Sequence, residues 1–242
     1  MSHDALVGAD TSTATTDTGV ITVDSAVSTG KTVTAAVVWE SGAGTIPTVS
    51  SVTDTRGNTW TVDKSAGGGG NATVATMIAR ARIATALQVG DTITIVIGEN
   101  RVRWAMQADA FDDVDASPLD KTAANNNPGN SAALSSGVTA ATAQAYELAV
   151  AVFGFGQGRT TTIPAGWSGT AKVETTAGST DRALQVIYKY TAATGTQEGT
   201  LTLSSGSTYT GLIATYKATA VAPATKAGPP RRRPQLRNLL IR

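Results

Sequence analysis

The chain contains no cysteine and only one histidine, His3, among its 242 residues. The absence of cysteine excludes disulfide bonds, thiolate nucleophiles and Cys-ligated zinc. A Ser-His-Asp or Cys-His arrangement would have to use His3, which we expect to lie in a flexible N-terminal arm. Metal sites built from several histidines are excluded as well. We therefore predict a non-enzymatic protein that needs no metal and no cofactor.

Other common signatures are also missing. No apolar run approaches the ~18 residues that a membrane-spanning helix requires. Neither G-x-x-x-x-G-K-[ST] nor a G-x-G-x-x-G after a strand occurs, so no phosphate-binding loop of these types is expected. The N-terminal sequence MSHDALVGADTSTATTDTG lacks a basic start and an apolar block, and we expect no secretory signal.

The strongest positive signal is an apolar alternation with a period of two. It covers Met77–Phe111, where Ile93, Ile95 and Ile97 alternate with threonines and other residues, and where Trp104 and Met106 continue the pattern. A period of two places successive side chains on opposite faces of a β-strand. The segment predicts three successive strands with one buried face.

The same pattern returns in Leu184–Ala218, where Leu184 corresponds to Met77 and Leu203 to Ile95. We predict an all-β fold, namely a duplicated antiparallel β-sandwich, jelly-roll-like or Ig-like, with extended terminal arms. The halves could close one sandwich or two small ones, and we favour one because each half has few large apolar residues. The predicted parts are a flexible segment 1–18, halves 19–111 and 137–218, a joint 112–136 and a C-terminal arm 219–242.

The C-terminal arm differs from the body in charge. The last 17 residues hold six of the 19 basic residues and no acid, which leaves 13 basic against 18 acidic residues before them. Its prolines favour extended chain, and its leucines have the spacing of a short helix that needs a surface to bind. We predict a docking segment rather than plain disorder or contact with nucleic acid or membrane. The predicted docking residues are Arg231, Arg232, Arg233, Leu236, Arg237, Leu239, Leu240 and Ile241.

Acidic residues gather before and within the predicted joint, at Asp109, Asp112, Asp113, Asp115 and Asp120. They could ligate calcium or supply two carboxylates to a glycosidase, but turn formation is the favoured interpretation. Among the aromatic residues, Trp60 and Trp104 lie on the apolar side of their strands and are predicted to be core. The predicted glycan contacts are Trp167 and Tyr209.

Three segments carry a family resemblance: VSSVTDTRGNTWTV, ADAFDDVDASPLDKTA and RRRPQLRNLLIR. They resemble virion structural proteins of tailed phages of actinobacteria, with Asp113 standing where a glycine is common. The resemblance implies a β-sandwich minor tail protein or capsid decoration protein, assembled in the host cytoplasm and carried on the virion. It implies other virion proteins or repeated copies as partners, and no catalytic residues. A carbohydrate-binding module that contacts the host surface is the alternative.

Overall fold

The computed structural model describes residues 1–40, 49–67, 74–176 and 181–219, and in these residues it is all-β. The antiparallel sheets form a duplicated sandwich arrangement, as predicted. The described part contains no helix that could cross a membrane.

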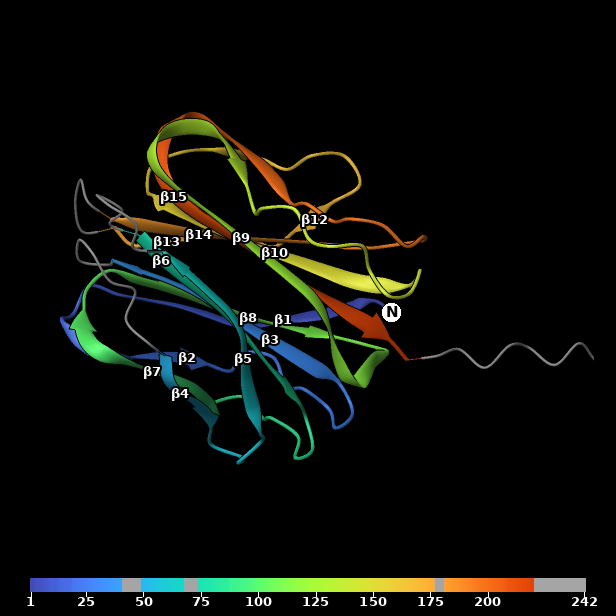
Figure 1. The fold of residues 1–242 in the computed structure, drawn as a ribbon. Coiled ribbons are helices and arrows are strands. Elements are labelled where there is room, and N and C mark those ends of the chain that lie inside the picture. Colours follow the sequence, from blue (N-terminus) through green and yellow to red (C-terminus); the bar gives the residue numbers. More distant parts are fainter. Residues whose placement is uncertain (41–48, 68–73, 177–180, 220–242) are drawn as a thin grey trace, which may run out of the picture.

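The first half of the chain forms two sheets, which lie in the middle and at the bottom of Figure 1. The first main sheet has the order β1-β8-β3-β6-β5, with strands His3–Ser12, Trp104–Phe111, Thr32–Glu40, Val74–Arg82 and Trp60–Gly67. The outer sheet has the order β2-β7-β4, with strands Thr16–Thr22, Thr92–Arg101 and Val49–Asp54. Apolar side chains of the two sheets, including Trp39, Met77, Ile95 and Trp104, form a first core.

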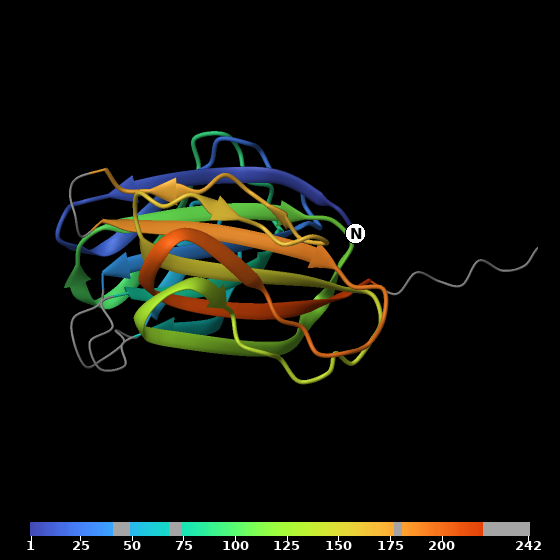
Figure 2. The ribbon, with the colours of Figure 1, turned by 90° about the horizontal axis from the view of Figure 1, so that it is seen from above.

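The second half repeats this strand order in one curled sheet, whose strands are seen from above in Figure 2. The second main sheet has the order β11-β15-β10-β14-β12, with β9 on β15 and β13 on β14. Its strands are β9 Val114–Ser135, β10 Glu147–Gly156, β11 Thr161–Thr162, β12 Ser168–Gly169, β13 Val173–Glu174, β14 Arg182–Tyr190 and β15 Thr200–Ala218.

Three clusters of buried side chains answer the question of one sandwich or two. The first core lies within the first half, and a second core around Phe153, Ile187 and Leu203 lies within the second half. A shared core, which includes Val38, Ile78, Val152 and Leu212, joins the two main sheets face to face. Each half is thus a small sandwich with its own core, and the favoured prediction of one sandwich is wrong. The small and medium-sized apolar residues of each half suffice to close its core, and the two halves pack together through the shared core.

A glycine allows the main sheets to approach closely. A Cβ atom on Gly154 of β10 would lie 2.4 Å from the Thr76 Cγ2 atom and 2.5 Å from the Val38 Cγ2 atom. Both of those residues belong to the first main sheet. Any side chain at position 154 would therefore push the halves apart.

Two predicted boundaries are wrong. Residues 1–18 are not a flexible arm, because β1 pairs along β8 and Val7 is fully buried. The predicted joint 112–136 is mostly the 22-residue strand β9, which pairs with β15. Both are outermost strands held by backbone hydrogen bonds, so they need no apolar alternation, and a proline such as Pro118 is tolerated there.

The predicted correspondence between the halves is one residue out of register at one point. Met77 lies opposite Val37 and faces the first core, whereas Leu184 lies opposite Gly154 and faces the shared core. Because side chains alternate along a strand, a shift of one residue exchanges the two faces. Ile95 and Leu203 do occupy matching positions, in the first and second core.

Candidate functional site

A cleft lies at the end of the molecule where the described chain begins and ends. Its volume is about 450 Å³, and it is lined by Met1, Asp113, Tyr146, Tyr190, Thr191, Ala218 and Thr219. Both ribbon views place the N-terminus near the end of β15 (Figures 1 and 2). Thr219, the last described residue, lies in the wall of the cleft.

Two tyrosines, Tyr146 and Tyr190, supply the aromatic rings and phenol hydroxyls that line the cleft. Tyr146 is 68% exposed and Tyr190 37% exposed, which makes them two of the few exposed large apolar side chains of the described residues. Partial burial, with the nearby Tyr188 and Asp112, raises the pKa of Tyr190, so its hydroxyl stays protonated and can donate a hydrogen bond. Exposed rings with polar tips are typical of surfaces that bind peptides.

One ion pair lies in the cleft, and a second group of ion pairs lies next to it along the chain. The N-terminal ammonium of Met1 lies 3.2 Å from the Asp113 carboxylate, which is 71% exposed. Lys31 contacts Asp4 at 2.7 Å and Asp112 at 2.9 Å, and these hydrogen bonds raise the pKa of Lys31. Of these groups, the Met1 ammonium and the Asp113 carboxylate belong to residues that line the cleft.

The cleft residues were missed in the sequence because Met1, Tyr146, Tyr190 and Thr219 are far apart along the chain. The only signal in the sequence was that Tyr146 follows a polar turn, a position that indicates an exposed rather than a buried aromatic residue. The predicted docking residues from Arg231 to Ile241, including Leu236 and Arg237, lie outside the described residues. Their role in docking stays a prediction.

Tyr209 is a wrong prediction as a glycan contact. Its side chain is only 4% exposed and belongs to the second core. Its hydroxyl accepts hydrogen bonds from the Asn125 Nδ2 at 3.2 Å and from the Ser135 backbone amide at 3.1 Å. The curl of β15 turns this residue inward, so it fastens β9 to β15.

Trp167 is half-buried and packs against the second core. The Lys189 ammonium lies over its ring, 4.6 Å from the centroid, and burial lowers the pKa of Lys189. This cation covers one face of the ring. Glycan contact by Trp167 stays a prediction. Trp104 is fully buried and Trp60 packs against the first core, so both core predictions are confirmed.

The acidic residues do not form one cluster. In the part of the chain that the structure describes, no three of His, Asp and Glu come together as metal ligands. Asp112 pairs with Lys31, Asp115 accepts a hydrogen bond from the Ser117 amide at 2.9 Å, and Asp120 pairs with Lys121 at 2.8 Å. Turn-forming and pairing roles account for these three residues.

The only histidine lies between the halves instead of in a free arm. His3 Nε2 lies 3.0 Å from the Asp109 Oδ1, and its ring stacks on Tyr188 with centroids 4.9 Å apart. Gln107 donates a hydrogen bond to the other oxygen of Asp109 at 2.7 Å. These contacts tie β1 and β8 to β14 of the second half.

A buried acid pair lies where β10 starts. The side chain of Glu147 is fully buried, and burial, with the nearby Asp120, raises its pKa. Burial alone would raise the pKa of Asp120 too, but hydrogen bonds from Lys121 and the Ala143 amide lower it. Because Glu147 has no exposed surface, this pair is placed to affect stability rather than to meet a substrate.

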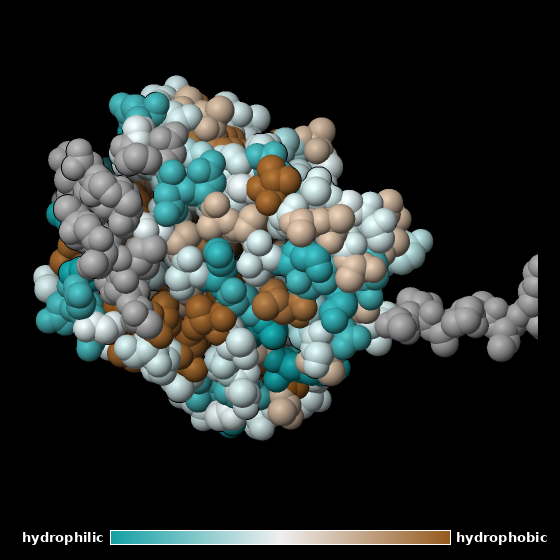
Figure 3. Space-filling model, viewed as in Figure 1, coloured by the Kyte–Doolittle hydropathy of each residue, from teal (hydrophilic) through white to brown (hydrophobic). Residues whose placement is uncertain are grey.

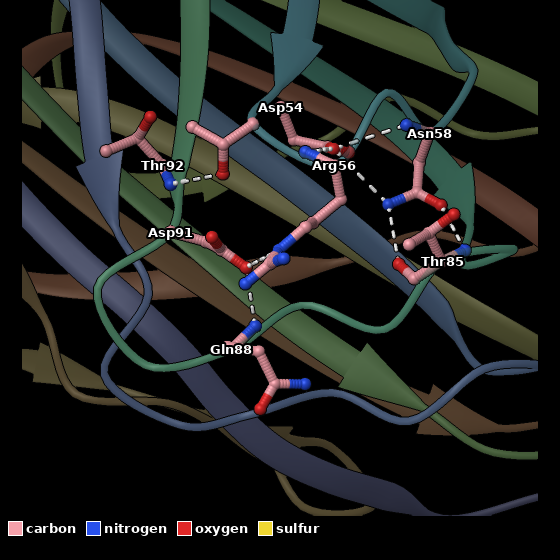
Figure 4. A network of polar contacts seen from close by, with 8 residues as sticks. Asp54, Arg56, Asn58, Thr85, Gln88, Asp91 and Thr92 are labelled. Carbon is pink, nitrogen blue, oxygen red and sulfur yellow. Dashed lines mark hydrogen bonds and ion pairs between the residues drawn. The ribbon is translucent and has the colours of Figure 1, made fainter.

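The VTDTRGN segment forms a hydrogen-bond network, shown in Figure 4. We call this network, centred on Asp54, Arg56 and Asn58, the lock. The Asp54 carboxylate accepts from the Arg56 amide at 2.8 Å, the Asn58 amide at 3.2 Å and the Trp60 indole at 2.7 Å. Gly57 has a φ of 73°, which suits glycine. The motif therefore closes the turn between β4 and β5 on itself.

The lock also holds a second turn, between β6 and β7. The Asn58 Oδ1 accepts from the amides of Ala84 and Thr85, both at 2.9 Å, and its Nδ2 donates to the Thr85 carbonyl at 3.0 Å. The Arg56 Nε donates to the Asp91 carboxylate at 2.6 Å. The VTDTRGN segment thus has a structural role, which is to hold these two turns together.

The comparisons with protein-family models, curated proteins and solved structures found no match for this chain.

Proposed function

We propose that the chain is a non-enzymatic structural component of a phage virion, a minor tail protein that docks on its neighbours through the C-terminal segment. Capsid decoration is the other position on a particle that the same resemblance implies. The observation that carries the proposal is the tyrosine cleft at the start of that segment.

The chemistry of the segment and of the cleft supports this proposal. Residues 220–242 contain four prolines and six basic residues, whereas residues 1–219 hold 13 basic against 18 acidic residues. Proline-rich peptides bind grooves lined by aromatic side chains, and arginines favour acidic surroundings. The cleft on one copy, with Tyr146, Tyr190 and the exposed Asp113, has the character needed to bind the segment of a second copy.

The direct test is incorporation into particles. Deleting residues 226–242 should leave a folded, soluble body and abolish its incorporation, measured by quantifying the protein in purified virions. The matched variant is the full chain with Tyr146→Ala and Tyr190→Ala, which should lower incorporation while the fold stays intact by circular dichroism. Normal incorporation of the truncated chain would overturn docking through the segment.

A second measurement addresses contact between copies. The mass of the full chain in solution, followed by light scattering over a concentration series, should increase with concentration and fall to that of a monomer after the deletion. A monomer in both cases would move the docking partner to a different virion protein. Glycan binding that is lost in Trp167→Ala would instead support the carbohydrate-binding alternative.

A further inference from the structure

A second pocket lies at the seam between the two halves, on the side where β5 and β9 run next to each other (Figure 1). Figure 3 shows the same face of the molecule, on which hydrophilic residues lie among apolar ones. We infer that it is a binding site for a small oxyanion, such as phosphate, sulfate or a carboxylate group. Its volume is about 230 Å³. The first half lines it with Thr32, Thr59, Thr61, Arg80 and Arg82, and β9 closes it with Ala116 and Pro118. This inference does not depend on the proposed virion role.

The register of the first main sheet explains why these side chains converge. Arg80 and Arg82 are two residues apart on β6 and therefore point to the same face. Thr61 lies opposite Arg80, and Thr32 lies opposite Arg82, in the neighbouring strands. Directly opposed residues of paired strands share a face. The sheet thus presents two guanidinium groups and their neighbouring hydroxyls toward β9.

The polar groups of this pocket are hydrogen-bond donors of the kind that oxyanions need. Guanidinium groups donate in a planar fork that fits two oxygens of a phosphate or carboxylate, and each hydroxyl can donate one further bond. Among the described lining residues there is no carboxylate. The lining therefore favours an anion over a cation.

The two arginines differ in how their charge is used. Arg80 pairs with Asp63, whose side chain is fully buried and also accepts a hydrogen bond from the Tyr216 hydroxyl at 2.9 Å. Arg82 is exposed and donates from NH1 to the Val114 carbonyl at 2.8 Å. Within the described residues it has no acidic partner. Two positive charges and one negative charge leave the pocket with a net charge of one positive unit.

The test is anion binding to the full chain at constant ionic strength. Inorganic phosphate, sulfate and acetate replace chloride in a titration followed by the melting temperature and by amide chemical shifts. We expect a saturable response, with the shifts confined to residues near the pocket. Glycerol phosphate and a uronate serve as further probes, because tighter binding than inorganic phosphate or acetate would identify a sugar-linked or polymer-linked anion as the source.

Three variants separate binding from folding. Arg82→Gln should weaken the affinity at least about tenfold, as expected for the loss of a charged hydrogen-bond donor, and Arg82→Lys should restore part of it. Arg101→Gln, which lies beside Glu40 at the opposite end of β3 from Thr32, is the matched control and should leave anion binding unchanged.

Two results would overturn the inference. One is a linear, unsaturable response to all the anions, which would indicate general salt effects. The other is saturable binding that Arg82→Gln leaves intact, which would place the anion elsewhere.

Discussion

The two halves share one strand order but are fastened in different ways. In the first half, separate strands β1 and β2, and β7 and β8, divide the chain between two sheets. In the second half, β9 and β15 each run through without interruption and bend from the main sheet into the curled layer. In the first half, side-chain hydrogen bonds of the lock join the two sheets. In the second half, the continuous backbone of β9 and β15 joins the main sheet to the curled layer.

The turns of the two halves show the same difference. In the first half Asp54 and Asn58 bind the turn before Trp60, and in the second half a short turn before Trp167 contains Gly166 with a φ of 83°. Both tryptophans pack against the core of their own half. The comparison shows that the two halves keep the same buried tryptophan contacts while the turns that precede them are stabilised differently.

Breaking the lock should have the largest effect. Asn58→Ala removes the partners of two backbone amides and one carbonyl, and the residue is only 7% exposed. We expect a loss of about 2–4 kcal/mol in the free energy of unfolding, measured by urea denaturation. The control is Ser168→Ala, an exposed site just after the matching turn, which should change stability by less than about 0.5 kcal/mol. Equal losses would contradict the proposed difference between the halves.

The second largest loss of stability is expected from a substitution that pushes the two halves apart. Gly154→Ala places a methyl group against Val38 and Thr76, and we expect a loss of about 1–3 kcal/mol from overpacking. Gly206→Ala is the matched control, because the nearest atom to its Cβ would lie at 3.4 Å. Chemical denaturation of both variants measures the difference. If Gly154→Ala is as stable as Gly206→Ala, the close contact of β10 with Val38 and Thr76 of the first main sheet does not limit stability.

The buried acid of the second half should make stability depend on pH. The pKa of Glu147 is raised by burial, so the folded state binds more protons than the unfolded state. Its contribution is present below the unfolded value of 4.5 and is lost as the pH rises through the folded pKa.

Glu147→Gln removes this loss. We expect the variant to be more stable than the native chain at pH 8, with the difference shrinking toward pH 4.5, as measured by melting temperature across that range. Asp120→Asn is the control, since the pKa of Asp120 is lowered and its stabilising contribution is instead lost as the pH falls. A difference between Glu147→Gln and the native chain that does not change with pH would refute this role.

The smallest effect is expected at Asp113, which has a φ of 57°. Glycine adopts this left-handed conformation without strain, and the ion pair that Asp113 makes with Met1 is exposed. Asp113→Gly should therefore raise the free energy of unfolding by less than about 1 kcal/mol, by urea denaturation. Asp113→Asn keeps a residue that tolerates this conformation and tests the charge alone. A loss above about 1 kcal/mol in Asp113→Asn would assign the ion pair a larger role.

The sequence predicts the strands in which apolar residues alternate regularly and misses those that bury only scattered side chains, such as Val7 of β1 and Leu134 of β9. The alternation of Ile93, Ile95 and Ile97 predicts β7 correctly, because packing against a core requires it. The polar strands β1 and β9 carry no such pattern, since backbone pairing at an edge places little demand on side chains. The sequence did indicate the turn at Asp113, because this aspartate stands where a glycine is common.

The cleft and the pocket could not be predicted because each is assembled from distant segments. Tyr146 and Tyr190 meet Met1 only after the second half has folded onto the first. The pocket beside Arg82 likewise requires β9, whose position against β5 follows from the pairing of β9 with β15. Tyr209 shows the opposite error, since a bend in β15 buries a residue that alternation alone leaves unassigned.

The shared core has a consequence for solubility. The apolar face that Val38 and Ile78 present in the first half is covered by its counterpart, with Val152 and Leu212, in the second. A half expressed alone would expose this face to water and would therefore be prone to aggregate. Each half thus acts as an intramolecular chaperone for the other.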